Sequence, residues 1–314
     1  MMFTTNPRAK IQGNIMEIHE KIKNLKKEKK AIILAHNYIS LEVQKIADIV
    51  GDSFQLARAA KEIEANIILF CGVTFMAETA KLLNPSTKVL LSNINASCPM
   101  ADMAEAADLK RFKEAHPSHL IVCYVNSTVA VKALSDVCVT SSNAVKIVEK
   151  LPKETPIMFV PDQNLGTYVQ KKTNRKIDLW DGFCPIHHLN ITLDDIYKAR
   201  DIFPDHSIIV HPECRPEIIE LADFVGSTKQ LLDYSEEHDR VIIGTEIGLI
   251  RMLQDKYPQK SIHALSERAE CVNMKKTTLD DVYHTLLYET NEIFISPDIS
   301  EKALLPIEKM LELG

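Results

Sequence analysis

The sequence predicts an α/β protein built from three similar three-layer units with parallel sheets, in a pseudo-three-fold arrangement around a central cavity. Two observations carry this prediction. Short apolar runs typical of buried strands alternate with helix-like segments, which is the pattern of parallel sheets covered on both faces. In addition, Cys98, Cys184 and Cys271 follow one another at intervals of 86 and 87 residues, which indicates a repeated unit.

The first unit is predicted to cover residues 1–103, and the helical C-terminal residues 279–314 are expected to pack back on it. Apolar spacing along this unit predicts alternating elements. These are helices over 1–30, 39–50, 53–63 and 73–83, strands over 31–36 and 66–72, and a further strand before Cys98.

The same order restarts in a second unit over residues 104–190 and in a third over 191–278. The second unit is predicted to contain helices over 101–115, 127–134, 144–151 and 164–171, with strands over 119–126 and 156–162. The third is predicted to contain helices over 192–203, 218–222, 229–234 and 247–254, with strands over 206–213, 240–246 and 260–265.

Equivalent positions support the repeat. The first strand of each unit ends near His36, Tyr124 and His211, which are 88 and 87 residues apart. A hydroxyl residue is expected to begin the next helix in each unit, at Ser53, Ser141 and Ser227, which are 88 and 86 residues apart. A drift of one or two residues over three copies indicates three homologous units.

Composition limits the classes of function. The formal charge of −6, without a basic stripe, argues against a nucleic-acid partner. The Lys-rich segment before residues 31–35 imitates a secretory signal, but its apolar part is too short. No apolar run approaches the roughly 18 to 20 residues of a membrane span. We therefore expect a cytoplasmic protein without a membrane partner, in which thiols stay reduced.

The seven cysteines divide by their surroundings. Cys71, Cys123 and Cys138 lie inside apolar runs and are expected to be small buried residues. Cys214 is expected to have a packing role. The three periodic cysteines instead lie beside Pro, Asn, Gly or charged residues, on segments that are predicted to be loops.

Polar side chains follow the predicted strands at their carboxyl ends, where parallel sheets bind ligands. His36, Asn37 and Tyr38 follow the first strand of the first unit. Tyr124 and Asn126 do so in the second unit, and His211 and Glu213 in the third. Hydroxyl residues in GDS, VTSS and VGST stand before helices, where they can cap free amides. Three helix N-termini facing one cavity would favour an anionic substrate.

The cysteine pattern indicates the kind of metal. No CxxC pair and no HExxH motif is present, and the Cys184-Pro-Ile-His187 spacing is only weak evidence for zinc. Three cysteines from three loops suit a cubane iron–sulfur cluster with one iron left open. An open iron can act as a Lewis acid on a substrate oxygen, which favours dehydration or condensation over electron transfer.

The chain resembles the quinolinate synthase family in AHNY, GDS, NASCPMAD, YVNS, TSSNAVK, WDGFCPIHH, HPECRPE, GSTKQLL and CVNMKKTTL. The resemblance implies a triangle of three α/β domains around a [4Fe–4S] cluster with one iron not ligated by protein, held by Cys98, Cys184 and Cys271. It also implies condensation of iminoaspartate with dihydroxyacetone phosphate to quinolinate, with release of phosphate and water, in NAD biosynthesis. Substrate contacts are implied for His36, Tyr38, Ser53, Tyr124, Asn126, Ser141, His211, Glu213 and Thr228.

Roles follow as hypotheses. Glu213 and His211 could shuttle protons, and Tyr38 and Tyr124 could donate hydrogen bonds or protons near the departing oxygens. Ser53, Ser141 and Thr228 would hold carboxylates or phosphate. The chain departs from the family in two ways: SERAEC lacks the additional cysteines of some members, and Val272 replaces the expected proline.

Two other interpretations stay open at this point. The same open iron could serve a hydro-lyase that acts on another small carboxylate, or the cluster could belong to a redox or oxygen sensor. A sensor would need a partner-binding tail or a DNA-binding helix, and the sequence predicts neither. The resemblance also implies functional coupling to an enzyme that produces iminoaspartate.

Overall fold

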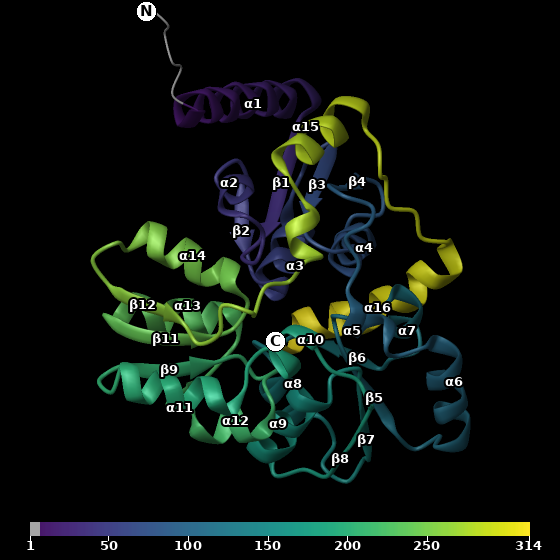
Figure 1. Ribbon diagram of the computed structural model, residues 1–314. Coiled ribbons are helices and arrows are strands. Elements are labelled where there is room, and N and C mark those ends of the chain that lie inside the picture. The colour runs from purple at the N-terminus through teal and green to yellow at the C-terminus, as the bar shows by residue number, and fades with distance from the viewer. Residues whose placement is uncertain (1–6) are drawn as a thin grey trace, which may run out of the picture.

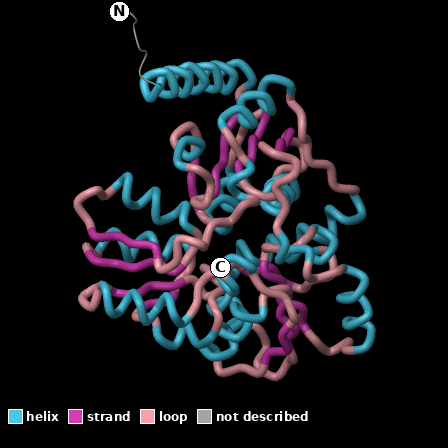
Figure 2. The backbone as a smooth tube through the Cα atoms, in the orientation of Figure 1, coloured by secondary structure: helices cyan, strands magenta, loops and turns pink. Residues whose placement is uncertain are grey.

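The computed structural model describes residues 7–314, with side chains from residue 16 onward, so the start of the predicted first helix lies outside the described residues. Within this part of the chain the strands form three separate four-stranded sheets, and the paired strands are parallel. Figure 1 shows the three sheets with their helices, and Figure 2 shows each group of strands flanked by helices. The predicted α/β class with parallel sheets is confirmed.

The first unit begins with a Lys-rich helix that runs into a buried strand, as the sequence predicts. Its elements are α1 (Pro7–Lys29), β1 (Ala31–His36), α2 (Leu41–Gln44), β2 (Ile49–Gly51), α3 (Ser53–Glu62), β3 (Ile67–Cys71), α4 (Thr74–Leu83), β4 (Lys88–Leu91) and α5 (Pro99–Asp102).

The second unit repeats this order with a shorter first helix. Its elements are α6 (Ala106–Ala115), β5 (Leu120–Tyr124), α7 (Val129–Lys132), β6 (Val137–Val139), α8 (Ala144–Lys150), β7 (Ile157–Val160), α9 (Gln163–Thr173), β8 (Ile177–Leu179) and α10 (Pro185–Leu189).

The third unit ends in a single 3-10 turn, and two helices follow it. Its elements are α11 (Leu193–Ile202), β9 (Ser207–Val210), α12 (Pro216–Leu221), β10 (Phe224–Val225), α13 (Thr228–Glu237), β11 (Arg240–Gly244), α14 (Ile247–Lys256), β12 (Ser261–Ala264) and η1 (Met274–Lys276). The C-terminal helices are α15 (Leu279–Tyr288) and α16 (Pro297–Leu313).

All three sheets have the same strand order. The orders are β2-β1-β3-β4, β6-β5-β7-β8 and β10-β9-β11-β12, so the first strand of each unit lies between the second and third. Strands β3 and β7 are buried along their whole length, which explains why their sequences, IILFC and IMFV, are apolar throughout. The shared order is consistent with the predicted pseudo-three-fold arrangement.

An aspartate recurs before the second strand of every unit. Its carboxylate accepts the backbone amide of an isoleucine at or near the start of the first strand, at 2.7 Å in all three units. The pairs are Asp48 with Ile33, Asp136 with Ile121, and Asp223 with Ile208. The repeat therefore extends to individual hydrogen bonds that join neighbouring strands.

Two local predictions are wrong. The helix predicted over 39–50 ends at Gln44, and residues 49–51 form β2 because they pair with β1. Such a short strand has no detectable periodicity in the sequence. Ser141 does not begin a helix, because the Asn143 side chain accepts hydrogen bonds from Thr140 and shapes a turn, and α8 begins at Ala144.

The C-terminal helices lie on two units. Helix α15 contacts α1, α2 and β3 of the first unit, whereas α16 contacts mainly α7 and β6 of the second, together with α4 and α8. The structure therefore differs from the expectation that all of 279–314 packs on the first unit. The reason is that α16 buries Ala303, Ile307 and Met310 near the edge strand β6. The unit boundaries stay predictions.

We predict that Asp136→Ala lowers the free energy of unfolding by about 1 to 3 kcal/mol, because the Ile121 amide loses a charged acceptor. Urea unfolding followed by circular dichroism measures this change. Asp205→Ala is the control, because this carboxylate is 79% exposed. Equal stability of the two variants would contradict a structural role for the repeated aspartate.

Candidate active site and metal centre

A pocket of about 200 Å³ is lined by residues from all three units. The sequence-predicted residues come together here although they lie far apart in the chain. They are His36, Tyr38, Ser53, Cys98, Tyr124, Asn126, Ser141, Cys184, His211, Glu213, Thr228 and Cys271. The pocket lies beyond the carboxyl ends of the first strands, because β1 ends at His36, β5 at Tyr124 and β9 one residue before His211.

Each of the three pocket cysteines precedes a short helical turn. Cys98 is the N-cap of α5 and Cys184 is the N-cap of α10, and a proline follows each at the first helical position. Proline suits this position because its missing N–H would have no helical partner. In the third unit Val272 takes this place, and the Cys271 carbonyl accepts the Lys275 amide. A turn therefore follows Cys271 even though valine stands in the place of proline.

The surroundings of the three thiols suit metal ligation. Burial raises the pKa of each thiol, to about 12 for Cys98, and an ionised neighbouring cysteine adds to the effect for Cys98 and Cys184. Backbone amides in the turns that follow the cysteines oppose this rise in pKa by donating hydrogen bonds to the sulfurs. A metal ion replaces the proton on such a thiol, and the amides then stabilise the thiolate.

Two buried carboxylates hold the cysteine backbones in the second and third units. Asp162 caps α9 and also accepts the Cys184 amide at 3.1 Å. Glu246 caps α14 and also accepts the Cys271 amide at 2.9 Å. Sequence reasoning missed both residues. The available signal was an acidic residue two positions after a buried strand, directly before a helix.

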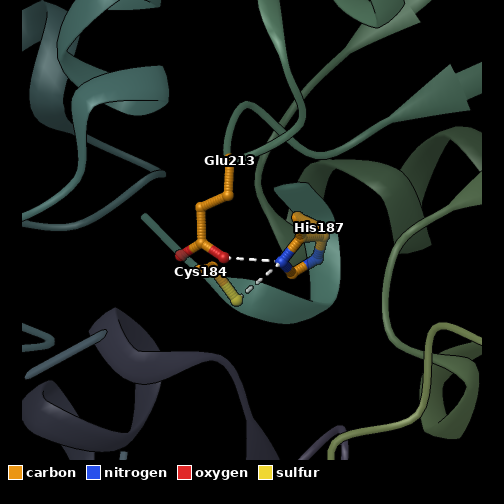
Figure 3. Close-up of side chains that lie close together, drawn as sticks. All are labelled: Cys184, His187 and Glu213. Atoms are coloured by element: carbon orange, nitrogen blue, oxygen red, sulfur yellow. Dashed lines mark hydrogen bonds and ion pairs between the residues drawn. The ribbon is translucent and has the colours of Figure 1, made fainter. Parts of the chain in front are cut away.

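Glu213 is the centre of a buried hydrogen-bond network. The Tyr124 hydroxyl donates to Glu213 Oε1 at 2.6 Å, and His187 Nδ1 contacts Glu213 Oε2 at 2.6 Å. His187 Nδ1 also lies 3.3 Å from Cys184 Sγ. Figure 3 shows the three side chains and the two contacts that His187 makes. The ligand atoms of Cys184, His187 and Glu213 lie within 4.8 Å of one another, an arrangement compatible with a metal ion. The C-x-x-H spacing was the sequence signal for His187.

The network continues to Tyr38 of the first unit. His187 Nε2 lies 2.9 Å from the Thr245 hydroxyl, which lies 2.7 Å from the Tyr38 hydroxyl. Tyr38 also contacts Thr228 at 2.9 Å. Burial raises the pKa of Tyr38 well above its ordinary value, so its hydroxyl keeps the proton. Sequence reasoning missed Thr245, because a lone threonine after a strand carries no distinctive signal.

The ionisation states around Glu213 follow from burial and contact. Burial alone would raise the pKa of Glu213, but the adjacent imidazoles of His187 and His211 hold it below its ordinary value. Burial lowers the pKa of His36 and of His211 to about 3, so both are neutral at pH 7. In each of them Nδ1 accepts a backbone amide, from Tyr38 and Glu213 respectively. The proton therefore lies on Nε2, and His211 Nε2 donates to Ser141 at 3.1 Å.

The hydroxyl residues occupy different helical positions. Ser53 and Thr228 are the first residues of α3 and α13, and the caps are Asp52 and Ser227.

Among the residues that the structure describes, the side-chain oxygen of Asn126 is buried without a hydrogen-bond partner. Because Asn126 lines the pocket, this oxygen is available to accept a hydrogen bond from a ligand.

A family model described as Quinolinate synthetase A protein matches residues 20–312. The chain belongs to this family. Quinolinate synthases from Caldicellulosiruptor saccharolyticus, Sulfurihydrogenibium sp. and Aquifex aeolicus are 50%, 47% and 48% identical to it over 304, 310 and 308 residues. Each alignment covers 96% of this chain and 100%, 100% and 95% of the respective relative.

Membership of the Quinolinate synthetase A family disfavours the hydro-lyase and sensor interpretations, since its named relatives are synthases of nearly the same length. The cysteine, histidine and glutamate group is compatible with a metal-dependent member of the family. Among the helices within residues 7–314, none is both long enough and apolar enough to cross a membrane.

We predict that Asp162→Ala lowers the free energy of unfolding of the metal-free protein by about 1 to 3 kcal/mol, because the cap of α9 and the acceptor for Cys184 are both lost. Iron bound after anaerobic reconstitution should also fall. Urea unfolding and an iron assay measure these effects. Asp181→Ala, at an exposed position in the same region, should match the wild type in both. Unchanged iron binding in Asp162→Ala would contradict the role of Asp162 in positioning Cys184.

Proposed function

We propose that the protein is an iron–sulfur quinolinate synthase that condenses iminoaspartate with dihydroxyacetone phosphate, releasing phosphate and water. The observation that carries the proposal is that three cysteines from three units line the same pocket as the polar residues implied to contact substrate. Membership of the family supports the same activity. The reaction would serve NAD biosynthesis.

Cys98, Cys184 and Cys271 would hold a [4Fe–4S] cluster with one iron not ligated by protein. The donor set fits this cofactor, because the three thiols come from separate loops, face one cavity and receive backbone amides. When bound, such a cluster supplies a Lewis acid for a substrate oxygen. His187 adjoins Cys184 and would orient that sulfur rather than replace it as a ligand.

The protein side chains provide an acid–base relay on the pocket wall. Glu213, ionised and hydrogen-bonded to Tyr124 and His187, would accept a proton from substrate. Once the Tyr38 hydroxyl has donated its proton to a departing oxygen, the contacts from His187 through Thr245 would let a proton return to Tyr38. Tyr38 and Tyr124 keep their protons in this buried site, so each could donate to a departing oxygen.

The anionic groups of the substrates would lie at the helix N-termini. Ser53 and Thr228 begin α3 and α13, whose first amides and positive dipole ends favour carboxylate or phosphate. Ser141, Asn126, His36 and His211 would complete the polar lining. Because both histidines are neutral at pH 7, they would bind by hydrogen bonds rather than by charge.

Functional coupling to an enzyme that produces iminoaspartate is part of the proposal. The pocket is small, and most of the polar side chains that line it are buried, as expected for a small-molecule site. We propose small anionic substrates as the partners of this site, with no nucleic acid or membrane involved.

The activity is tested by anaerobic purification, iron and sulfide assays, and incubation with iminoaspartate generated in place and dihydroxyacetone phosphate. Quinolinate, separated by chromatography, should form only when both substrates are present. An intact cluster without quinolinate formation would refute the proposed function.

We predict that Cys184→Ala abolishes both the brown cluster and quinolinate formation while the fold is retained, because one thiolate ligand is lost. Absorbance, iron content and far-ultraviolet circular dichroism measure these properties. Cys138→Ser is the control, because Cys138 is buried in β6 beside Cys123 of β5. Loss of the cluster in Cys138→Ser would contradict the division of the cysteines into cluster ligands and buried core residues.

We predict that Glu213→Gln lowers kcat by about 10²- to 10⁴-fold while cluster content is retained, because the proton acceptor is replaced by an isosteric amide. Steady-state kinetics and iron content measure the two effects. Glu217→Gln serves as the matched control, since Glu217 forms an ion pair with Arg215 outside the pocket lining. Wild-type kcat in Glu213→Gln would exclude the relay.

A further inference from the structure

We propose that the ion pair between the buried Glu246 and the partly buried Lys275 is a positioning device that connects the turn carrying Tyr38 to the loop carrying Cys271. The inference rests on the proposed function, because Tyr38 and Cys271 belong to the proposed active site. It adds two positioning residues, and it makes the placement of Tyr38 depend on the order of a metal-ligand loop.

Glu246 connects a helix to the Cys271 loop. Its side chain is 1% exposed, and Oε2 accepts the Gly248 amide at 2.7 Å as the cap of α14. Oε1 accepts the Cys271 amide at 2.9 Å and contacts Lys275 Nζ at 2.8 Å. Both carboxylate oxygens are therefore engaged, one by α14 and the other twice by the loop.

Lys275 carries this connection into the first unit. Its ammonium also donates to the backbone carbonyl of Tyr38. The carbonyls on either side, of Asn37 and Ile39, accept from the Gln44 side chain at 3.0 and 2.9 Å, within the first unit. The middle carbonyl of this turn is thus held by a cation from the third unit.

Gly248 shows how tightly these groups approach one another. A Cβ at this position would lie 2.7 Å from the Tyr38 carbonyl oxygen, 2.7 Å from Glu246 Oε2 and 2.8 Å from Lys275 Nζ. Alanine is ordinarily favoured over glycine inside a helix. Glycine here allows the start of α14, the ion pair and the Tyr38 turn to meet without a clash.

A similar contact joins the second unit to the third. Asn164, two residues after Asp162, donates from Nδ2 to the Glu213 carbonyl at 2.9 Å. Asp162 and Glu246 both follow the third strand of their unit by two residues. In the second unit, the segment that holds the Cys184 amide therefore also holds the Glu213 backbone in the third unit. In the third unit, Glu246 holds the Cys271 amide, and its ion-pair partner Lys275 holds the Tyr38 backbone in the first unit.

Tyr38 is held by the third unit at both ends. Its hydroxyl contacts Thr228 and Thr245, and its carbonyl contacts Lys275. A metal bound to Cys271 would restrain the loop that carries Lys275. Release of the metal would loosen the loop, and the Tyr38 turn would lose a restraint that its own unit does not replace.

Hydrogen–deuterium exchange tests the coupling on the reconstituted holoprotein and on the protein after anaerobic chelation. In the wild type, metal removal should raise exchange in peptides covering 271–277 and 36–40. In Lys275→Met, exchange in 36–40 should be raised by about five-fold or more in both the holoprotein and the metal-free protein. The reason is that the Tyr38 carbonyl has lost its contact with the loop, whether or not a metal orders that loop. Wild-type exchange in 36–40 for this variant would overturn the proposal.

Further variants separate positioning from general destabilisation. Lys276→Met is the matched control, because its exposed ammonium donates to the Asn95 carbonyl at 2.7 Å. It should show wild-type exchange in 36–40. Gly248→Ala keeps both charges and should raise exchange there as Lys275→Met does. Lys275→Arg keeps a cation and should restore part of the protection. Equal exchange in Gly248→Ala and the wild type would contradict the proposal.

Kinetics provides an independent measurement. Lys275→Met should retain iron and cluster absorbance but lose about ten-fold or more in kcat, because Tyr38 is misplaced while the three cysteines remain. Failure of the wild type to form quinolinate would refute the proposed function, yet the exchange comparison would still decide the coupling. Wild-type kcat together with wild-type exchange in 36–40 would refute the coupling alone.

Discussion

The direction of the strands is the constraint on which the site depends. Parallel pairing in each sheet sends the carboxyl ends of β1, β5 and β9 towards one pocket, and the residues at these ends are His36, Tyr124 and His211. Side chains that are far apart in the sequence meet only because all three units present the same end. Reversal of one sheet would remove its cysteine from the pocket together with its polar residues.

The second feature of the molecule is the way in which buried polar groups are satisfied. Glu213 and Glu246 are buried carboxylates, and a buried charge is tolerated only with close partners. Glu213 finds its partners, Tyr124 and His187, in the second unit. Glu246 is paired within the third unit with Lys275, which also holds the Tyr38 turn of the first. The same contacts therefore join the units and orient the pocket, so stability and function share residues.

Sequence patterns predicted much of the fold and many of the residues in the pocket. Continuous apolar runs revealed β3 and β7, and the cysteine period revealed the repeat, because both depend on local composition or regular spacing. The three-residue strand β2 was missed because its pairing with β1 is a long-range contact. Thr245 was missed for the same reason, since its importance lies in the distances to His187 and Tyr38.

The sequence by itself determined the α/β class, the three-fold repetition, the family and the separation of loop cysteines from core cysteines, because these depend on periodicity and residue type. Only the tertiary structure decided that Asp162 and Glu246 hold cysteine backbones, that His187 contacts Glu213, and that α16 crosses to the second unit. The physical reason is that a hydrogen bond or a packed face needs a partner, and these partners lie in distant segments that only folding brings within reach.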